Sequence, residues 1–436
     1  MINNQLKLLS LLCVISILTF CFFKLNINKE NLIFIIFIIS LLIGLIIFYF
    51  SNIFLKKQII FFISTLYISL FILELKYEKL FYSICKSDEC QKNEKMNLEK
   101  KLNKQLNYNL LPKFFIGDNV SLMPLSTFRN TYILGNNEND YYPYFLTDRY
   151  GFINNDKHYD QDFQDILIIG DSYAMGGTVN YDETLQGQLS KKGLKTLSFG
   201  FGGNGPLMAL GSLIEFKKVV MPKKIIYLFS ATNDINYDLF LEKKNKILVQ
   251  YLNDEYKQNL LKKSKQIDEI LESKYKQLLN SKKQDQTSFV NQFKLSKIRY
   301  LVGIENKGMD NYNYKYNDNL TYTLKQAVDS DDINSNYFLL NKIIARMKHE
   351  SGTSELFIFF IPEIKNFINN KKSNQYYAIK KISEKNNIKL IDIFNNSKIK
   401  DYEFRKSMYP INYAHPNEKG YGVWAETILE NFKLYD

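Results

Sequence analysis

The stretch Asp165-Ile-Leu-Ile-Ile-Gly-Asp171-Ser172-Tyr173 decides the fold. Its run of aliphatic residues at 166–169 is typical of a strand that is buried on both faces of a parallel sheet. A glycine follows this run, and a carboxylate and a hydroxyl come next. Because open α/β sheets bind their ligands at the carboxyl ends of their strands, the stretch predicts that Ser172 is exposed at the functional edge of a sheet.

Strand-like and helix-like segments alternate after this stretch. The apolar strand candidates are residues 166–169, 196–199, 225–229, 356–361 and 389–393. The helix candidates between and after them are residues 184–192, 207–220, 337–349, 374–385 and 418–432. This alternation indicates a parallel sheet covered by helices on both faces. We therefore predict an α/β domain over residues 165–436, built on a three-layer, flavodoxin-like sheet.

Two segments do not follow the alternation. Residues 76–164 begin as a Lys/Glu/Asn-rich stalk and continue as Tyr- and Phe-containing short strands, which predicts a lead-in or cap. Residues 236–335 form a long insertion that contains a Lys/Gln/Glu-rich helical run over 242–283. An insertion of this length is a lid, a partner surface or a solvated appendage. Its departure from the sheet directly after Asn233 favours a lid.

The N-terminal part of the chain carries three apolar stretches, at residues 8–23, 32–50 and 59–75. The second and third are long enough to cross a hydrocarbon core of ~30 Å, and no cleavage site of the signal-peptide type follows the first. Residues 1–75 are therefore predicted to form three transmembrane helices. The distribution of Lys and the close pair Cys85 and Cys90 favour a multi-pass protein with a periplasmic or otherwise extracytoplasmic C-terminal domain. Whether the two cysteines form a disulfide stays open.

The charge and composition exclude some classes of function. The formal net charge is +12, from 57 basic and 45 acidic residues among 436. Lys is spread along the chain without Arg clusters or a reader motif, so we expect no nucleic-acid partner. A weak attraction to anionic membranes or glycans stays open. No metal-ligand spacing and no phosphate-binding motif appears, and we predict neither a metal nor a cofactor.

The chain has only three histidines, so few residues are candidates for a general base. His158 lies in a charged loop and His349 at a polar helix end, so both are expected to be ordinary surface residues. His415 precedes Pro416 and a helix start, beside the expected active edge of the sheet. Together with Ser172 it is the leading candidate for a base that takes the proton of a nucleophile.

Two further segments can supply hydrogen-bond donors for an oxyanion. Gly203 lies in a glycine-rich turn after the second strand, where backbone N–H groups can approach a ligand closely. Asn233 ends the third strand, and its side-chain amide can point at the same crevice. Each feature alone also fits a plain structural role: a tight turn needs glycine, and asparagine often caps a turn.

The four blocks Gly-Asp-Ser172, Gly203, Asn233-Asp and His415-Pro-Asn resemble, in this order, the SGNH (GDSL-type) hydrolases. The resemblance implies that Ser172 is the nucleophile and that its own N–H is one oxyanion donor. Gly203 would be the backbone donor, Asn233 the side-chain donor and His415 the general base. The segment at residues 147–152 also resembles the lead-in of membrane-anchored bacterial members linked to cell-surface glycans.

The sequence departs from the family pattern at Asn412, where these hydrolases usually have an aspartate three residues before the histidine. An amide oxygen can accept the Nδ1–H bond of His415, but it offers no charge to an imidazolium. Asn412 is thus expected in this orienting role, and another carboxylate, Glu363, Asp401 or Glu403, is a possible substitute.

The expected function is that of a membrane-anchored serine esterase. It would cleave acyl esters, O-acetyl esters above all, of cell-envelope glycans or lipids through an acyl-Ser172 intermediate. Its expected partners are the lipid bilayer, the acylated substrate and envelope polysaccharide-assembly proteins. Two alternatives stay open: an O-acyltransferase that acts on surface polysaccharide, and a weakly active or inactive glycan-binding or assembly protein that has kept the fold.

Overall fold

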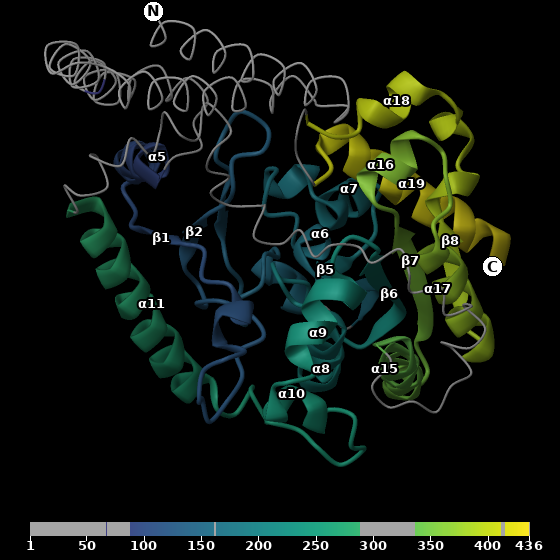
Figure 1. Ribbon diagram of the computed structural model, residues 1–436, viewed down its shortest axis with the longest axis horizontal. Coiled ribbons are helices and arrows are strands. Elements are labelled where there is room, and N and C mark those ends of the chain that lie inside the picture. The colour runs from purple at the N-terminus through teal and green to yellow at the C-terminus, as the bar shows by residue number, and fades with distance from the viewer. Residues whose placement is uncertain (1–66, 68–87, 161–162, 288–335, 411–414, 436) are drawn as a thin grey trace, which may run out of the picture. The chain divides into compact units, whose positions relative to one another are not determined.

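The computed structural model describes residue 67 and residues 88–160, 163–287, 336–410 and 415–435 (Figure 1). Residues 85–279 and 321–436 belong to one compact unit, which contains the main sheet and the candidate site. The sheet strands are β4 (Gln164–Ile169), β5 (Thr196–Ser198), β6 (Pro222–Ser230), β7 (Glu355–Ile361) and β8 (Lys389–Asp392). The five strands predicted from the apolar runs therefore lie where the sequence places them.

The main sheet is parallel throughout, with the strand order β5-β4-β6-β7-β8. Numbered from β4, this is the order 2-1-3-4-5, which is that of flavodoxin-like sheets. The chain runs from β4 to β5 on one side of the sheet and from β6 to β7 on the other, so the topological switch point lies between β4 and β6. The carboxyl ends of β4 and β6 are adjacent, because Ile169 pairs with Tyr227 in the register of the two strands. Ser172 and Asn233 follow these two ends.

Helices cover both faces of this sheet. One face packs against α7 (Leu185–Lys191) and α19 (Glu418–Tyr435), and the other against α8 (Pro206–Phe216), α15 (Asn336–Ser351) and α17 (Asn374–Lys385). Alternate residues of β4 pack against the helices on opposite faces of the sheet. Ile168 belongs to the same buried cluster as Trp424 of α19, and Ile169 belongs to the same buried cluster as Leu210 of α8. Burial of this aliphatic run on both sides explains why it shows no polar alternation.

The lead-in segment, residues 76–164, forms a separate small sheet within the described residues. Its strands are β1 (Leu106–Tyr108), β2 (Tyr132–Leu134) and β3 (Tyr144–Leu146), with β1 parallel and β3 antiparallel to β2. The helix α5 (Asp88–Leu102) packs on it, since Leu98, Leu106 and Leu134 form one buried cluster.

A buried turn joins the lead-in segment to the main sheet. The Asp148 carboxylate accepts hydrogen bonds from the backbone N–H groups of Tyr150 and Phe152 and from the side chain of Asn154. Asn154 in turn bonds both the N–H and the C=O of Ser198 in β5, each at 2.8 Å. The motif at residues 147–152, through Asn154, therefore fixes the lead-in segment to the edge strand β5 of the main sheet.

The described part of the insertion contains α9 (Leu239–Glu242), α10 (Lys246–Gln250) and α11 (Ser264–Thr287). In Figure 1, α11 runs beside β1 and β2. Its Tyr275 hydroxyl accepts a hydrogen bond from Tyr108 N at 3.0 Å, and its Asp268 pairs with Arg129. This helix thus packs on the lead-in segment. Residues 288–335 lie outside the described residues, so the expected lid stays a prediction.

The remaining described elements are short helices that lie mostly at the ends of the strands. They are η1 (Pro112–Phe115), η2 (Asp156–Asp160), α6 (Ser172–Met175), η3 (Tyr181–Glu183), η4 (Lys217–Val219), the π-helix η5 (Asp234–Asp238), α16 (Ile364–Ile368), η7 (Ile393–Asn395), η8 (Ser397–Lys400) and α18 (Tyr402–Lys406). The nucleophile candidate begins α6, and η5 follows β6 at the same edge of the sheet.

The predicted transmembrane region requires a correction. Across the residues that the structure describes, no helix combines the length and the apolar character needed to cross a membrane. This finding contradicts the prediction of three spans and, with it, the multi-pass membrane localisation. The stretches at 8–23, 32–50 and 59–75 lie outside the described residues except for Tyr67. Cys85 also lies outside them, so its pairing with Cys90 is untested.

Candidate active site

The turn after β4 places Ser172 at the switch point of the sheet. Gly170 has a φ of +148°, and a Cβ there would lie 2.9 Å from the carbonyl oxygen of Leu228, so the position requires glycine. The next residue, Asp171, caps α6: its Oδ1 accepts a hydrogen bond from Tyr173 N at 2.9 Å. Ser172 is thereby held, half-buried, as the first residue of α6, at the carboxyl end of β4 where the sequence places it.

The structure brings His415 to Ser172, 243 residues earlier in the chain. The distance from Ser172 Oγ to His415 Nε2 is 2.8 Å, which is a hydrogen bond. The imidazole lies against the ring of Tyr173, with ring centroids 4.9 Å apart. Nucleophile and base candidates are therefore in direct contact, as the sequence predicts.

The other imidazole nitrogen meets a carboxylate that sequence reasoning missed. His415 Nδ1 lies 2.8 Å from Glu138 Oε1, and His415 N donates to Glu138 Oε2 at 3.2 Å. Only 14% of the Glu138 side chain and 16% of the His415 side chain are exposed. A carboxylate at Nδ1 places the imidazole proton there and leaves Nε2 as the acceptor for the Ser172 hydroxyl.

The loop that carries Glu138 connects β2 and β3 of the small sheet. Asn136 N donates to the carbonyl of Gly177 at 3.0 Å, and Asn139 Nδ2 donates to the carbonyl of Thr178 at 3.0 Å. Gly177 and Thr178 directly follow α6, the helix that Ser172 begins. One backbone and one side-chain hydrogen bond thus tie the loop of the acid to the segment that follows the nucleophile's helix.

The carboxylates considered from the sequence have other partners. Asp401 caps α18 by accepting from Phe404 N at 2.7 Å, Glu363 accepts from Asn366 Nδ2 at 3.1 Å, and Glu403 lies within α18. The acid at His415 Nδ1 is Glu138 instead. Asn412 lies outside the described residues.

The charge of Glu138 tunes the base. Burial disfavours the imidazolium form of His415, but the hydrogen bond to Glu138, its negative charge and that of Asp171 outweigh the burial, so the pKa of His415 is raised. Lys113 opposes this rise. The imidazolium that forms when Ser172 gives up its proton is therefore stabilised.

Two backbone N–H groups that the sequence predicts as oxyanion donors have no competing partner among the described residues. Gly203 has a left-handed φ of +77°, which explains the glycine at this point of the turn after β5. In the described part of the chain, neither Gly203 N–H nor Ser172 N–H donates a hydrogen bond to the protein. Both groups match the roles that the resemblance implies.

Asn233 departs from its expected role. Its Nδ2 donates to Asp171 Oδ2 at 2.9 Å and also to Asp238 Oδ2, and its Oδ1 accepts from Ser230 Oγ at 2.6 Å. An amide nitrogen carries two hydrogens, and both are used. Asn233 lies at the correct edge of the sheet, but in this conformation its side chain is part of a buried network and has no hydrogen for an oxyanion.

Three buried carboxylates take part in this network. Asp171, Asp234 and Asp238 each offer one oxygen, and these atoms lie within 4.8 Å of one another, close enough to hold a cation. Burial raises the pKa of all three, well above its ordinary value for Asp234 and to about 8 for Asp238. Asp171 and Asp238 accept hydrogen bonds from the Asn233 amide, and Asp234 accepts from the Tyr227 hydroxyl and from Ser230 N, so the three carboxylates form a hydrogen-bonded frame.

The other two histidines have ordinary roles, as expected. His158 Nδ1 donates to the carbonyl of Thr196 at 3.2 Å. His349 lies near the end of α15 with 71% of its side chain exposed.

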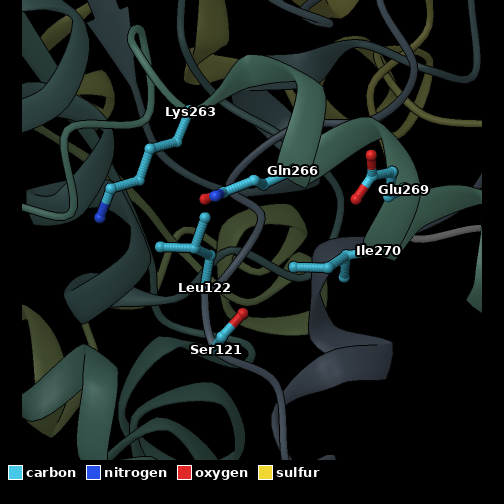
Figure 2. A pocket seen from close by; sticks show the side chains of 6 residues that line it. All are labelled: Ser121, Leu122, Lys263, Gln266, Glu269 and Ile270. Atoms are coloured by element: carbon cyan, nitrogen blue, oxygen red, sulfur yellow. The ribbon is translucent and has the colours of Figure 1, made fainter.

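A pocket of about 400 Å³ lies elsewhere, between α11 and the lead-in segment (Figure 2). Its lining residues are Ser121, Leu122, Lys263, Gln266, Glu269 and Ile270. Figure 2 shows Gln266 and Ile270 pointing from α11 toward Leu122. None of the residues around Ser172 contributes to this pocket.

No known family model matches the chain, and no curated protein matches it. The case for a function therefore rests on the site geometry and on the motif resemblance.

Proposed function

We propose that the protein is a serine-dependent acyl-ester hydrolase. The observation that carries this proposal is the unbroken chain of hydrogen bonds from Ser172 Oγ through His415 to Glu138. Nucleophile, base and orienting acid in this order are the parts that acyl transfer through serine requires. The resemblance to SGNH hydrolases supports the same assignment of Ser172, Gly203 and His415.

In the first half of the proposed reaction, Ser172 Oγ attacks the ester carbonyl carbon and its proton moves to His415 Nε2. The π electrons of the carbonyl move to its oxygen, where the N–H groups of Ser172 and Gly203 receive the negative charge. Glu138 holds the imidazolium by its Nδ1–H. The tetrahedral intermediate then expels the alcohol oxygen, which takes the proton from Nε2 and leaves an acyl-Ser172 ester.

In the second half, water attacks the acyl-Ser172 carbonyl and gives its proton to His415 Nε2. Collapse of the second tetrahedral intermediate releases the carboxylic acid and returns the proton to Ser172 Oγ. If a sugar hydroxyl replaces water, the same residues transfer the acyl group, so an O-acyltransferase is the neighbouring alternative. As substrate class we propose O-acylated glycans, O-acetyl esters first, with lipid esters as the alternative. The lead-in motif at residues 147–152 supports the glycan.

Hydrolysis of p-nitrophenyl acetate by purified full-length protein tests this function. We expect turnover that Ser172→Ala and His415→Ala remove, whereas the matched serine variant Ser190→Ala in α7 retains it. Hydrolysis of equal rate in Ser172→Ala would contradict the proposal. Folded protein without any hydrolysis or covalent labelling at Ser172 would favour the rival class, a glycan-binding or assembly protein that has kept the fold.

A further inference from the structure

The oxyanion side of the site is one donor short of the set that the sequence implies. Both amide hydrogens of Asn233 go to carboxylates, at Asp171 and Asp238. The remaining donors are two backbone N–H groups, those of Ser172 and Gly203. Preorganised donors at the developing charge supply a large part of the rate enhancement in acyl transfer, so a further donor at this point would matter.

Lys113 of η1 lies beside Gly203, one of the two remaining donors. A Cβ placed on Gly203 would be 2.4 Å from Lys113 Cδ and 2.9 Å from Lys113 Cγ, so the lysine stem lies directly against the glycine. Two more bonds of about 1.5 Å each separate Cδ from the ammonium nitrogen. The ammonium therefore ends within a few ångströms of the turn that presents the Gly203 N–H.

The charge of Lys113 acts on both sides of the site. It opposes the rise in the pKa of His415 and in that of Asp238, so the ammonium lies within electrostatic reach of the base and of the buried carboxylates. Lys113 itself is half-buried. Among the described residues, no hydrogen bond or ion pair holds its ammonium. A partly desolvated cation in this position is suited to a transient negative charge.

We propose that Lys113 is a catalytic residue that donates an ammonium N–H to the oxyanion, in the place that the sequence assigns to the Asn233 side chain. The inference rests on the proposed serine chemistry. As the bond from Ser172 Oγ to the carbonyl carbon forms and the π electrons move to oxygen, the new negative charge meets the ammonium as well as the N–H groups of Ser172 and Gly203. Lys113 keeps its proton throughout and only shares it in a hydrogen bond.

This arrangement gives the lead-in segment a direct part in the chemistry. Glu138 orients the base from the loop between β2 and β3, and Lys113 would stabilise the oxyanion from η1. Both residues belong to the lead-in segment, whereas Ser172 follows β4 and His415 precedes α19.

The test is steady-state hydrolysis of p-nitrophenyl acetate by Lys113→Met, Lys113→Gln and Lys113→Arg, with Lys192→Met on the exposed end of α7 as the matched control. We expect kcat to fall about 10²-fold in the Met and Gln variants, in the range found for loss of one oxyanion donor, with KM nearly unchanged. Lys113→Arg should restore a part of kcat, because it keeps the charge. Thermal unfolding shows which variants are folded, and Gln or Arg carries the test if Met is not.

Three outcomes would overturn the inference, and they are distinguishable. Ser172-dependent hydrolysis with unchanged kcat in folded Lys113→Met and Lys113→Gln would remove Lys113 while leaving the esterase intact. A loss confined to KM for p-nitrophenyl hydrogen succinate, with acetate hydrolysis unchanged, would make Lys113 a binding residue for an anionic substrate. Absence of any Ser172-dependent hydrolysis in the unaltered protein would overturn the proposed function and this inference together.

Discussion

Glu138 accepts two hydrogen bonds from His415, one from the imidazole Nδ1–H at 2.8 Å and one from the backbone N–H at 3.2 Å, although 277 residues separate them. The first bond fixes the tautomer and the second fixes the position of the loop that carries the imidazole. Loss of the carboxylate would therefore affect both the electrostatics and the placement of the base.

Glu138→Gln keeps the shape of the side chain and removes its charge. We expect kcat for ester hydrolysis to fall about 10²–10⁴-fold, because the imidazolium in the transition state loses its counter-charge and the tautomer is no longer enforced. The control is Asp140→Asn in the same loop, where the side chain is exposed. Equal kcat values for the two variants would show that Glu138 has no role in the chemistry.

The pH dependence of kcat/KM should report the raised pKa of His415. Only neutral imidazole can take the Ser172 proton, so activity should increase with pH through a midpoint above the ordinary histidine value of 6.5. Glu138→Gln removes the strongest influence that raises this pKa, so the midpoint should move to lower pH. A midpoint that stays in place would mean that another group controls the profile.

Asn412→Asp tests whether the acid position of the sequence motif is still needed. Because Glu138 already occupies His415 Nδ1, we expect the turnover of Asn412→Asp to stay within about twofold of the unaltered protein. Combining Asn412→Asp with Glu138→Gln asks whether an aspartate can rescue the lost charge. A large rise in turnover for the single variant would show that the Glu138 contact is not the functional one.

Asp238 links the buried carboxylate network to stability. Burial raises its pKa from 3.8 to about 8, so between these pH values the folded protein holds a proton that the unfolded chain releases. Stability from this group is therefore full below about pH 4 and decreases as the pH rises to 8. Asp238→Asn, whose oxygen can still accept from Asn233, should gain at least about 1 kcal/mol of unfolding free energy at pH 9 relative to its change at pH 4. Denaturant unfolding at the two pH values measures this difference.

The main sheet could be predicted from the sequence, because buried parallel strands require uninterrupted apolar runs, such as residues 166–169. Ser172, Gly203 and His415 could also be predicted as site residues. Each follows a strand or precedes a helix at the carboxyl edge of the sheet, where open sheets place their sites. These features can be recognised from local sequence patterns, without knowledge of the tertiary structure.

Glu138 and Lys113 could not be found in this way. Glu138 lies among Asn137, Asn139 and Asp140 in a polar loop, and nothing in that run separates it from its neighbours. Its role depends on docking of the small sheet against Gly177 and Thr178, a contact that has no local sequence signal. The hydrogen bond from the Asn233 amide to Asp238 also depends on the tertiary structure. An Asn-Asp pair at the end of a strand indicates a turn, but it does not indicate which partners the amide hydrogens have. The three predicted spans rested on the length and apolar character of residues 8–23, 32–50 and 59–75, and no helix among the described residues is long and apolar enough to cross a membrane.

Covalent labelling by a fluorophosphonate, read as intact mass and by peptide mapping, tests the central claim most directly. The Ser172–His415–Glu138 chain predicts a single adduct on Ser172, no adduct in Ser172→Ala, and labelling that is slower in His415→Ala and in Glu138→Gln than in Asp140→Asn. An adduct that persists in Ser172→Ala, or labelling of Ser172 at the same rate in His415→Ala, would contradict the account.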